Sequence, residues 1–72
     1  MSAAYGMGPV REMLIALRLE QYAEAFEEEG FDDLPYLCSL DAASLAEVAS
    51  TVKMKPGHAM KLRTMLPTYL KT

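Results

Sequence analysis

Apolar residues recur every three or four positions in four stretches of the chain, a spacing that places them on one face of a helix. In the first stretch the apolar positions are Val10, Met13, Leu14 and Leu17. Pro9 precedes them, and proline suits the first position of a helix because an N–H there would have no partner. The pattern therefore predicts a helix of about two turns that starts at Pro9 and ends before Arg18.

The second stretch combines a short apolar stripe with many acidic residues. Tyr22, Ala23 and Phe26 form the stripe, and Ala25 can extend it. The other faces hold Glu20, Glu24, Glu27, Glu28 and Glu29. Gly30 follows, and we expect it to adopt the left-handed conformation that ends many helices. Because acids at a helix C-terminus oppose the helix dipole, we expect them to attract a partner of positive charge.

Two aspartates predict the starts of the next two helices. Asp33 is the expected N-cap of a weaker, single-turn helix that tolerates Pro35 near its start. Asp41 is the expected N-cap of a better-patterned helix, whose buried side consists of Leu45, Val48, Ala49 and Val52. The middle of the chain is thus predicted to be a short helix followed by a longer one.

The last helix is predicted to open at Lys55-Pro56-Gly57-His58. Its apolar positions are Met54 just before it, Ala59 or Met60, Leu62, Met65 and Leu66. We expect the methionines Met13, Met54, Met60 and Met65 to fill the core. Pro67 either ends the helix near Leu66 or kinks it so that it continues to Leu70. The whole pattern predicts an all-α fold, a compact bundle of five helices.

Length and composition narrow the class of protein. A chain of 72 residues is one small domain, and at 51% hydrophobic residues it is too apolar to be disordered. No apolar run reaches the ~18–20 residues of a membrane span. We expect residues 1–8 to be a flexible lead-in without the features of a secretory signal, and residues 9–70 to form the domain. The single cysteine, Cys38, allows no internal disulfide and suits an intracellular, most simply cytoplasmic, location.

Charge divides the chain into two unequal parts. All ten acidic residues lie in residues 1–50, together with only Arg11 and Arg18. Residues 51–72 contain no acid, and their basic residues are Lys53, Lys55, Lys61, Arg63 and Lys71. A domain with one negative and one positive region can attract a second copy head to tail, and such a contact need not stop at two copies.

Five segments in order resemble the sterile alpha motif (SAM) domain. Residues 10–26 read VREMLIALRLEQYAEAF and are similar to the opening of that family. The further matching segments are Gly30-Phe31-Asp32, Leu40-Asp41 with Leu45, Gly57-His58, and Lys61-Leu62. Three departures stand out: Met13 replaces a usual tryptophan, Arg18 replaces a usual glycine, and the chain between Val48 and Gly57 is about three residues longer. We expect that extra length to add a turn to the fourth helix.

The resemblance implies a protein–protein interaction module that pairs with another SAM domain, of the same or another protein, through two surfaces. The acidic, mid-loop surface would comprise Glu27, Glu28, Glu29, Asp32, Asp33, Asp41 and Glu47. The basic surface at the start of the fifth helix would comprise Lys53, Lys55, Pro56, Gly57, His58, Lys61 and Arg63.

Other interpretations stay open. Some SAM domains bind RNA hairpins, and Lys53, Lys55, Lys61 and Arg63 are the residues that would contact phosphates here. Membrane-lipid binding through the same lysines is weaker, because the last helix lacks bulky aromatic residues. His58 can brace the helix start instead of contacting a partner, and the acidic run can be a solvated helix end. Cys38 is expected to be a buried apolar residue; we expect no enzyme, cofactor or metal site in so small a bundle.

Overall fold

The computed structural model describes residues 6–71, which form an all-α domain. The five α-helices are α1 (Met7–Ala16), α2 (Ala23–Glu28), α3 (Leu34–Ser39), α4 (Ala42–Thr51) and α5 (Pro56–Met65). Two 3₁₀ helices complete them: η1 (Glu20–Tyr22) leads directly into α2, and η2 (Leu66–Lys71) directly continues α5. The predicted five-helix, all-α fold is confirmed, and α5 with η2 is the longest helical segment.

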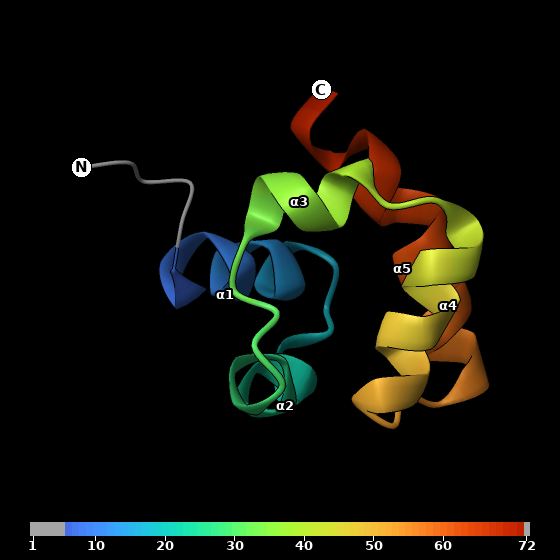
Figure 1. Cartoon of the computed structure of the whole chain (residues 1–72), viewed down its shortest axis with the longest axis horizontal. Coiled ribbons are helices and arrows are strands. Elements are labelled where there is room, and N and C mark those ends of the chain that lie inside the picture. The colour runs from blue at the N-terminus through green and yellow to red at the C-terminus, as the bar shows by residue number, and fades with distance from the viewer. Residues whose placement is uncertain (1–5, 72) are drawn as a thin grey trace.

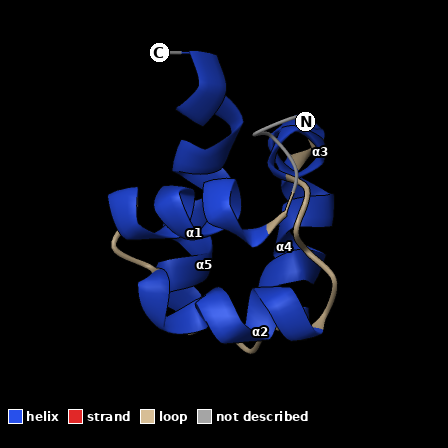
Figure 2. Cartoon of the chain, turned by 90° about the vertical axis from the view of Figure 1, so that its left-hand side faces the viewer, coloured by secondary structure: helices blue, strands red, loops and turns tan. Residues whose placement is uncertain are grey.

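The helices are arranged in two groups that α3 connects (Figure 1). α1 and α2 lie in the left half of that view, and α4 and α5 pack side by side in the right half. α3 lies across the upper side, where it packs against η2. The radius of gyration is 10.9 Å, close to the ~11 Å expected for a compact chain of this length. Short connections hold the helices around one interior, as the side view shows (Figure 2).

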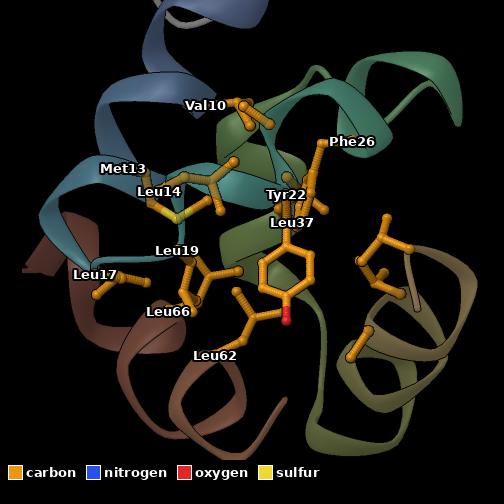
Figure 3. Close-up of a cluster of buried hydrophobic side chains, with 14 of the residues drawn as sticks. Val10, Met13, Leu14, Leu17, Leu19, Tyr22, Phe26, Leu37, Leu62 and Leu66 are labelled. Atoms are coloured by element: carbon orange, nitrogen blue, oxygen red, sulfur yellow. The ribbon is translucent and has the colours of Figure 1, made fainter. Parts of the chain in front are cut away.

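That interior is a single hydrophobic core to which every helix contributes (Figure 3). The predicted apolar faces of the first, second and fourth helices are buried as expected. The core consists of Val10, Met13, Leu14, Leu17, Leu19, Tyr22, Ala23, Phe26, Leu34, Leu37, Leu45, Val48, Ala49, Val52, Leu62 and Leu66. Because only Leu62 and Leu66 come from α5 and its continuation, the last helix lies at the edge of this core rather than across it.

Three helices end in the same turn. After α1, the Leu19 N–H donates to the Leu14 carbonyl and the Arg18 N–H to the Ile15 carbonyl, which is the Schellman pattern. The same pair of bonds closes α2 around Gly30 and α4 around Lys53. The central residue is left-handed each time, with φ of 62° at Arg18, 83° at Gly30 and 61° at Lys53. The expectation for Gly30 is confirmed, and Arg18 and Lys53 are non-glycine residues in the same conformation.

The helix starts fall into two types. Asp33 and Asp41 cap α3 and α4 as predicted: the Asp33 carboxylate accepts the Tyr36 N–H at 3.2 Å, and the Asp41 carboxylate accepts the Ser44 N–H at 2.8 Å. The N-cap of α5 is Lys55, whose side chain makes no capping hydrogen bond. The start of the last helix therefore lacks the acceptor that the two preceding helices have.

The predicted start of the first helix is wrong by two residues. The first helix begins at Met7 rather than Pro9, so Met7 and Gly8 belong to α1 and not to the predicted lead-in. The rest of that lead-in, residues 1–5, lies outside the described residues.

The methionines and the cysteine also differ from expectation. Met60 and Met65 are exposed rather than core residues, because the buried side of α5 is only wide enough for Leu62. Cys38 is partly buried instead of buried. At Pro67 the helix tightens into η2, whose i→i+3 bonding suits the loss of a donor, and continues to Lys71. Among residues 6–71, no helix is long and apolar enough to cross a membrane.

Candidate interaction surfaces

The basic surface centres on the turn between α4 and the first turn of α5. The side chains of Lys53 and Lys55 are exposed there, and so are Pro56 and Gly57. Pro56 fixes the first helical position and has no N–H to satisfy. Since Lys55 provides no capping side chain, the positive end of the helix dipole adds to the charge of two lysines. This part of the predicted basic surface faces solvent as expected.

His58 braces the start of α5 against the first half of the chain. Its Nδ1 lies 2.6 Å from the Tyr22 hydroxyl, and the two rings meet edge to face with centroids 5.5 Å apart. The same hydroxyl oxygen accepts the Lys55 N–H at 3.3 Å. The hydroxyl can accept the Lys55 N–H and still hydrogen-bond with Nδ1, so one oxygen joins both residues at the start of α5. Of the two interpretations of His58, the bracing one matches this geometry.

Lys61 also belongs to the interior contacts of the domain. Its Nζ donates to the carbonyl oxygen of Leu17 at 2.9 Å, and the side chain is half-buried. Leu17 is the C-cap of α1, so the ammonium group satisfies a carbonyl at the negative end of that helix. Lys61 was predicted as a partner-binding residue, and the structure gives it a role in joining α5 to α1.

The acidic residues fall into two separate places. Glu27, Glu28 and Glu29 are exposed at the end of α2, and Asp32 is exposed in the connection to α3. Asp41 and Glu47 lie on α4, in the other half of the molecule (Figure 1). The structure therefore brings together the acids at the end of α2 and the start of α3, but not the whole predicted set.

Hydrogen bonds and ion pairs involve some of these acids within the domain. Asp33 and Asp41 are helix caps, and the backbone and side-chain groups of Ser44 lower the pKa of the Asp41 carboxyl. A 3.9 Å contact joins the Glu27 carboxylate to the Arg11 guanidinium, with both side chains about half exposed. Such an exposed pair contributes little to stability. Glu28, Glu29 and Asp32 remain as exposed acids whose carboxylates have no hydrogen bond or ion pair among the described residues.

A groove between α4 and α5 was not predicted from the sequence. Its volume is about 460 Å³. Four of its lining residues are small: Ala46, Ala49, Ser50 and Ala59. Its larger lining residues are Met54, Pro56, Met60 and Arg63. Of these, Met60 is 59% exposed. The row of small residues on one face of α4 was the available sequence signal, but it becomes a groove only once α5 is placed beside it.

Other chemistry finds little support in the described residues. The Cys38 thiol is partly buried, and this desolvation raises its pKa, so the reactive thiolate is disfavoured. Within residues 6–71, His, Cys, Asp and Glu side chains form no cluster of three that could hold a metal ion.

Comparison of the chain with known protein families, with curated proteins and with solved structures found no match.

Proposed function

We propose that this domain is a protein–protein interaction module that associates with another domain of the sterile alpha motif type, either a second copy of itself or a different protein. The acidic surface at the end of α2 (Glu28, Glu29 and Asp32) would contact the basic surface at the start of α5 (Lys53, Lys55, Pro56 and Gly57). The sequence resemblance suggests this class of function. The observation that carries the proposal is the placement of charge at two helix ends.

Each of these helix ends has the locally unfavourable sign of charge. Glu28 and Glu29 lie at the C-terminus of α2, where the helix dipole is already negative. Lys55 lies at the N-terminus of α5, where the dipole is positive. Arg11 approaches Glu27 in the last turn of α2, but within residues 6–71 no opposite charge pairs with Glu28, Glu29 or Lys55. Association that places the acidic helix end of one domain against the basic helix end of another reduces the unfavourable charge at both ends.

The contact would be modest and sensitive to salt. Exposed charges on a domain of this size are screened within about 8 Å at physiological ionic strength. A single such contact gains strength when several copies act together, as in a chain of domains or a multidomain protein. We include an intracellular location in the proposal, since the chain has one cysteine and needs no disulfide.

RNA binding through the start of α5 is the alternative. It would use Lys53, Lys55 and Arg63, but Lys61 already donates to the Leu17 carbonyl. The sequence pI of about 4.9 also disfavours binding to a polyanion. We therefore treat RNA as an outcome of the test rather than as a second proposal.

The test uses two charge reversals, Glu29→Lys and Lys55→Glu, in sedimentation velocity over a wide concentration range at low and high salt. Each reversal places the favourable sign at a helix end, so each variant should be as stable as the parent or slightly more so. We expect the parent to associate in a concentration- and salt-dependent manner and each variant to remain monomeric. An equimolar mixture of the two should form dimers only, through the one intact pair of surfaces.

Asp33 and Asp41 are unsuitable for this experiment because both are helix caps. Glu12 provides the control, since it is exposed on α1 away from both surfaces. Glu12→Lys should associate like the parent. If both reversals associate normally, these surfaces do not mediate association. Binding of a labelled RNA hairpin that Lys55→Glu abolishes and Glu29→Lys leaves intact would favour the alternative.

A further inference from the structure

We propose that the groove between α4 and α5 is a docking site for the Tyr36 side chain of a second copy of this chain. The inference rests on the proposed function and identifies an apolar contact at its centre. Charge complementarity alone aligns two domains but does little to hold them, whereas an aromatic side chain in a pocket is the typical energetic anchor of an interface.

The groove is apolar and bordered by positive charge. Its small lining residues leave room for a ring to approach the helix backbones, and the lining residues Met54 and Met60 have flexible side chains that can adapt to it. Arg63 lines it, and the exposed Lys55 immediately precedes its Pro56. No acidic residue lines the groove. An occupant that matches this pattern has one large apolar side chain with carboxylates close beside it.

Tyr36 is the exposed apolar residue of this chain that has those neighbours. It is 58% exposed on α3. Its N–H donates to the Asp33 carboxylate at 3.2 Å, so a negative charge lies beside its backbone, and Asp32 immediately precedes that residue. Residues 19–52 contain no basic residue, so no cation of the same segment neutralises these acids.

The other exposed large apolar residues fit less well. Ile15 shares α1 with Glu12 but lies about one turn from both Arg11 and Arg18. Met65 and Leu70 belong to the segment without acids. Met60 belongs to the groove itself. Among the exposed large apolar side chains of residues 6–70, only Tyr36 therefore combines an aromatic ring with neighbouring carboxylates.

The chemistry of the contact follows from the side chains involved. The ring would lie between the thioether sulfurs of Met54 and Met60, an arrangement that sulfur and aromatic rings favour. The guanidinium of Arg63 would contact the ring face or the carboxylate of the partner's Asp33. A volume of about 460 Å³ accommodates one aromatic ring with part of its helix.

The two halves of this contact lie on different elements, so one copy can offer both at once. Tyr36 is on α3, and it is not among the residues that line the groove of its own chain. A contact between unlike surfaces is heterologous and adds further copies in the same direction. The inference therefore predicts open, head-to-tail chains rather than closed dimers.

The experiment compares Tyr36→Ala and Met60→Glu in sedimentation velocity. Both side chains are largely exposed in the single domain, so neither change should impair folding, which circular dichroism and thermal unfolding will verify. We expect each variant to associate at least tenfold more weakly than the parent. An equimolar mixture should give dimers, because Tyr36→Ala retains the groove and Met60→Glu retains the tyrosine. Leu70→Ala and Met65→Glu are the matched controls and should associate within about twofold of the parent.

A cross-link locates the contact directly. In a Cys38→Ser background, one chain with Tyr36→Cys is mixed with another with Met60→Cys under mild oxidation. We expect a disulfide-linked heterodimer, and much less of it when Met65→Cys replaces Met60→Cys.

The outcomes separate this inference from the proposed function. If Lys55→Glu and Glu29→Lys abolish association while Tyr36→Ala and Met60→Glu do not, the groove contact is wrong and the charged surfaces stand. If only Tyr36→Ala weakens association and no cross-link forms with Met60→Cys, the tyrosine docks elsewhere and the inference is also overturned. A parent chain that stays monomeric at all concentrations rules out the second copy as occupant.

Discussion

α1 and α5 have the same length, ten residues, but they are held in the domain in different ways. α1 buries Val10, Met13 and Leu14 within its own span. α5 buries only Leu62. Three hydrogen bonds also join α5 and its N-cap to the first part of the chain. The Lys61 ammonium donates to the Leu17 carbonyl, the Lys55 N–H donates to the Tyr22 hydroxyl, and that hydroxyl also hydrogen-bonds with His58 Nδ1. The first helix is placed by hydrophobic burial, and the last one by Leu62, by packing against α4 and by these polar contacts.

Because α5 buries so few side chains, more of its surface remains available to a partner. A helix with a wide buried face has few positions for binding, whereas α5 exposes Pro56, Gly57, Met60 and Arg63. The polar contacts meanwhile fix the position of its first turn. The Tyr22 hydroxyl holds both the N-cap residue and His58, so the start of α5 is ordered without a capping acid of its own. Such preorganisation lowers the entropic cost of binding a partner.

The largest effect is expected when one methionine side chain in each helix is shortened to alanine. Met13 is fully buried, so Met13→Ala should lower the free energy of unfolding by about 2–5 kcal/mol, which a domain this small can barely tolerate. Met60→Ala removes the same atoms from an exposed position of α5 and should cost about 0.5 kcal/mol or less. Urea unfolding followed by circular dichroism measures both. Similar costs for the two variants would show that α5 is held by burial after all.

The elements that could be predicted from sequence are those placed by burial. The stripes of α1 and α4 were correct residue by residue, because a 3.6-residue period with one apolar face determines what is buried. The caps Asp33 and Asp41 were also predictable, since a cap involves only residues three positions apart. For α5 the same period was misleading. Met60 and Met65 fit the pattern, but the core has no room left for them at its edge.

The second prediction removes one hydroxyl group. Tyr22→Phe keeps the buried ring but removes the acceptor for the Lys55 N–H and the partner of His58 Nδ1. We expect the free energy of unfolding to fall by about 1–3 kcal/mol, because two partly buried polar groups lose their bonds. Amide exchange measured by NMR should speed up at the start of α5 more than in α1.

Tyr36→Phe is the matched control, because the Tyr36 ring is mostly exposed. This variant should have the same free energy of unfolding as the parent. Uniform changes in amide exchange along the chain for Tyr22→Phe would mean that the hydroxyl contributes general stability instead of fixing the start of α5.

The sequence offered bracing of the helix start by His58 as one interpretation, but the partners in the polar contacts of α5 could not be predicted because they are far apart in the chain. Tyr22 and His58 are separated by 36 positions. Lys61 and Leu17 are separated by 44 positions. A lysine that satisfies a carbonyl of another helix has the same sequence appearance as a surface lysine, which is why Lys61 was assigned to the binding surface. The groove depends in the same way on the placement of α5 beside α4.

The smallest predicted effect concerns the turns that end α1, α2 and α4. All three need a left-handed residue, and only the second has glycine. A side chain in this conformation costs about 1–2 kcal/mol. Substitution by glycine removes this cost, but the greater freedom of glycine in the unfolded chain offsets part of the stability gained. Arg18→Gly and Lys53→Gly should therefore each raise the free energy of unfolding by about 0.5–1 kcal/mol.

Gly30→Ala is the inverse change. No atom lies within 4 Å of the position that its Cβ would occupy, so any loss of stability would come from the backbone conformation alone. Thermal unfolding measures the stability of all three variants.

Sedimentation velocity distinguishes Arg18→Gly from Lys53→Gly by their association. Arg18 lies outside both proposed surfaces, so Arg18→Gly should stabilise the domain and leave association unchanged. Lys53→Gly should stabilise the domain and weaken association, because Lys53 belongs to the basic surface at the start of α5. This result would explain why Lys53 occupies a strained position where glycine would be more stable: its charge contacts a partner. If the two variants associate equally, that explanation is wrong.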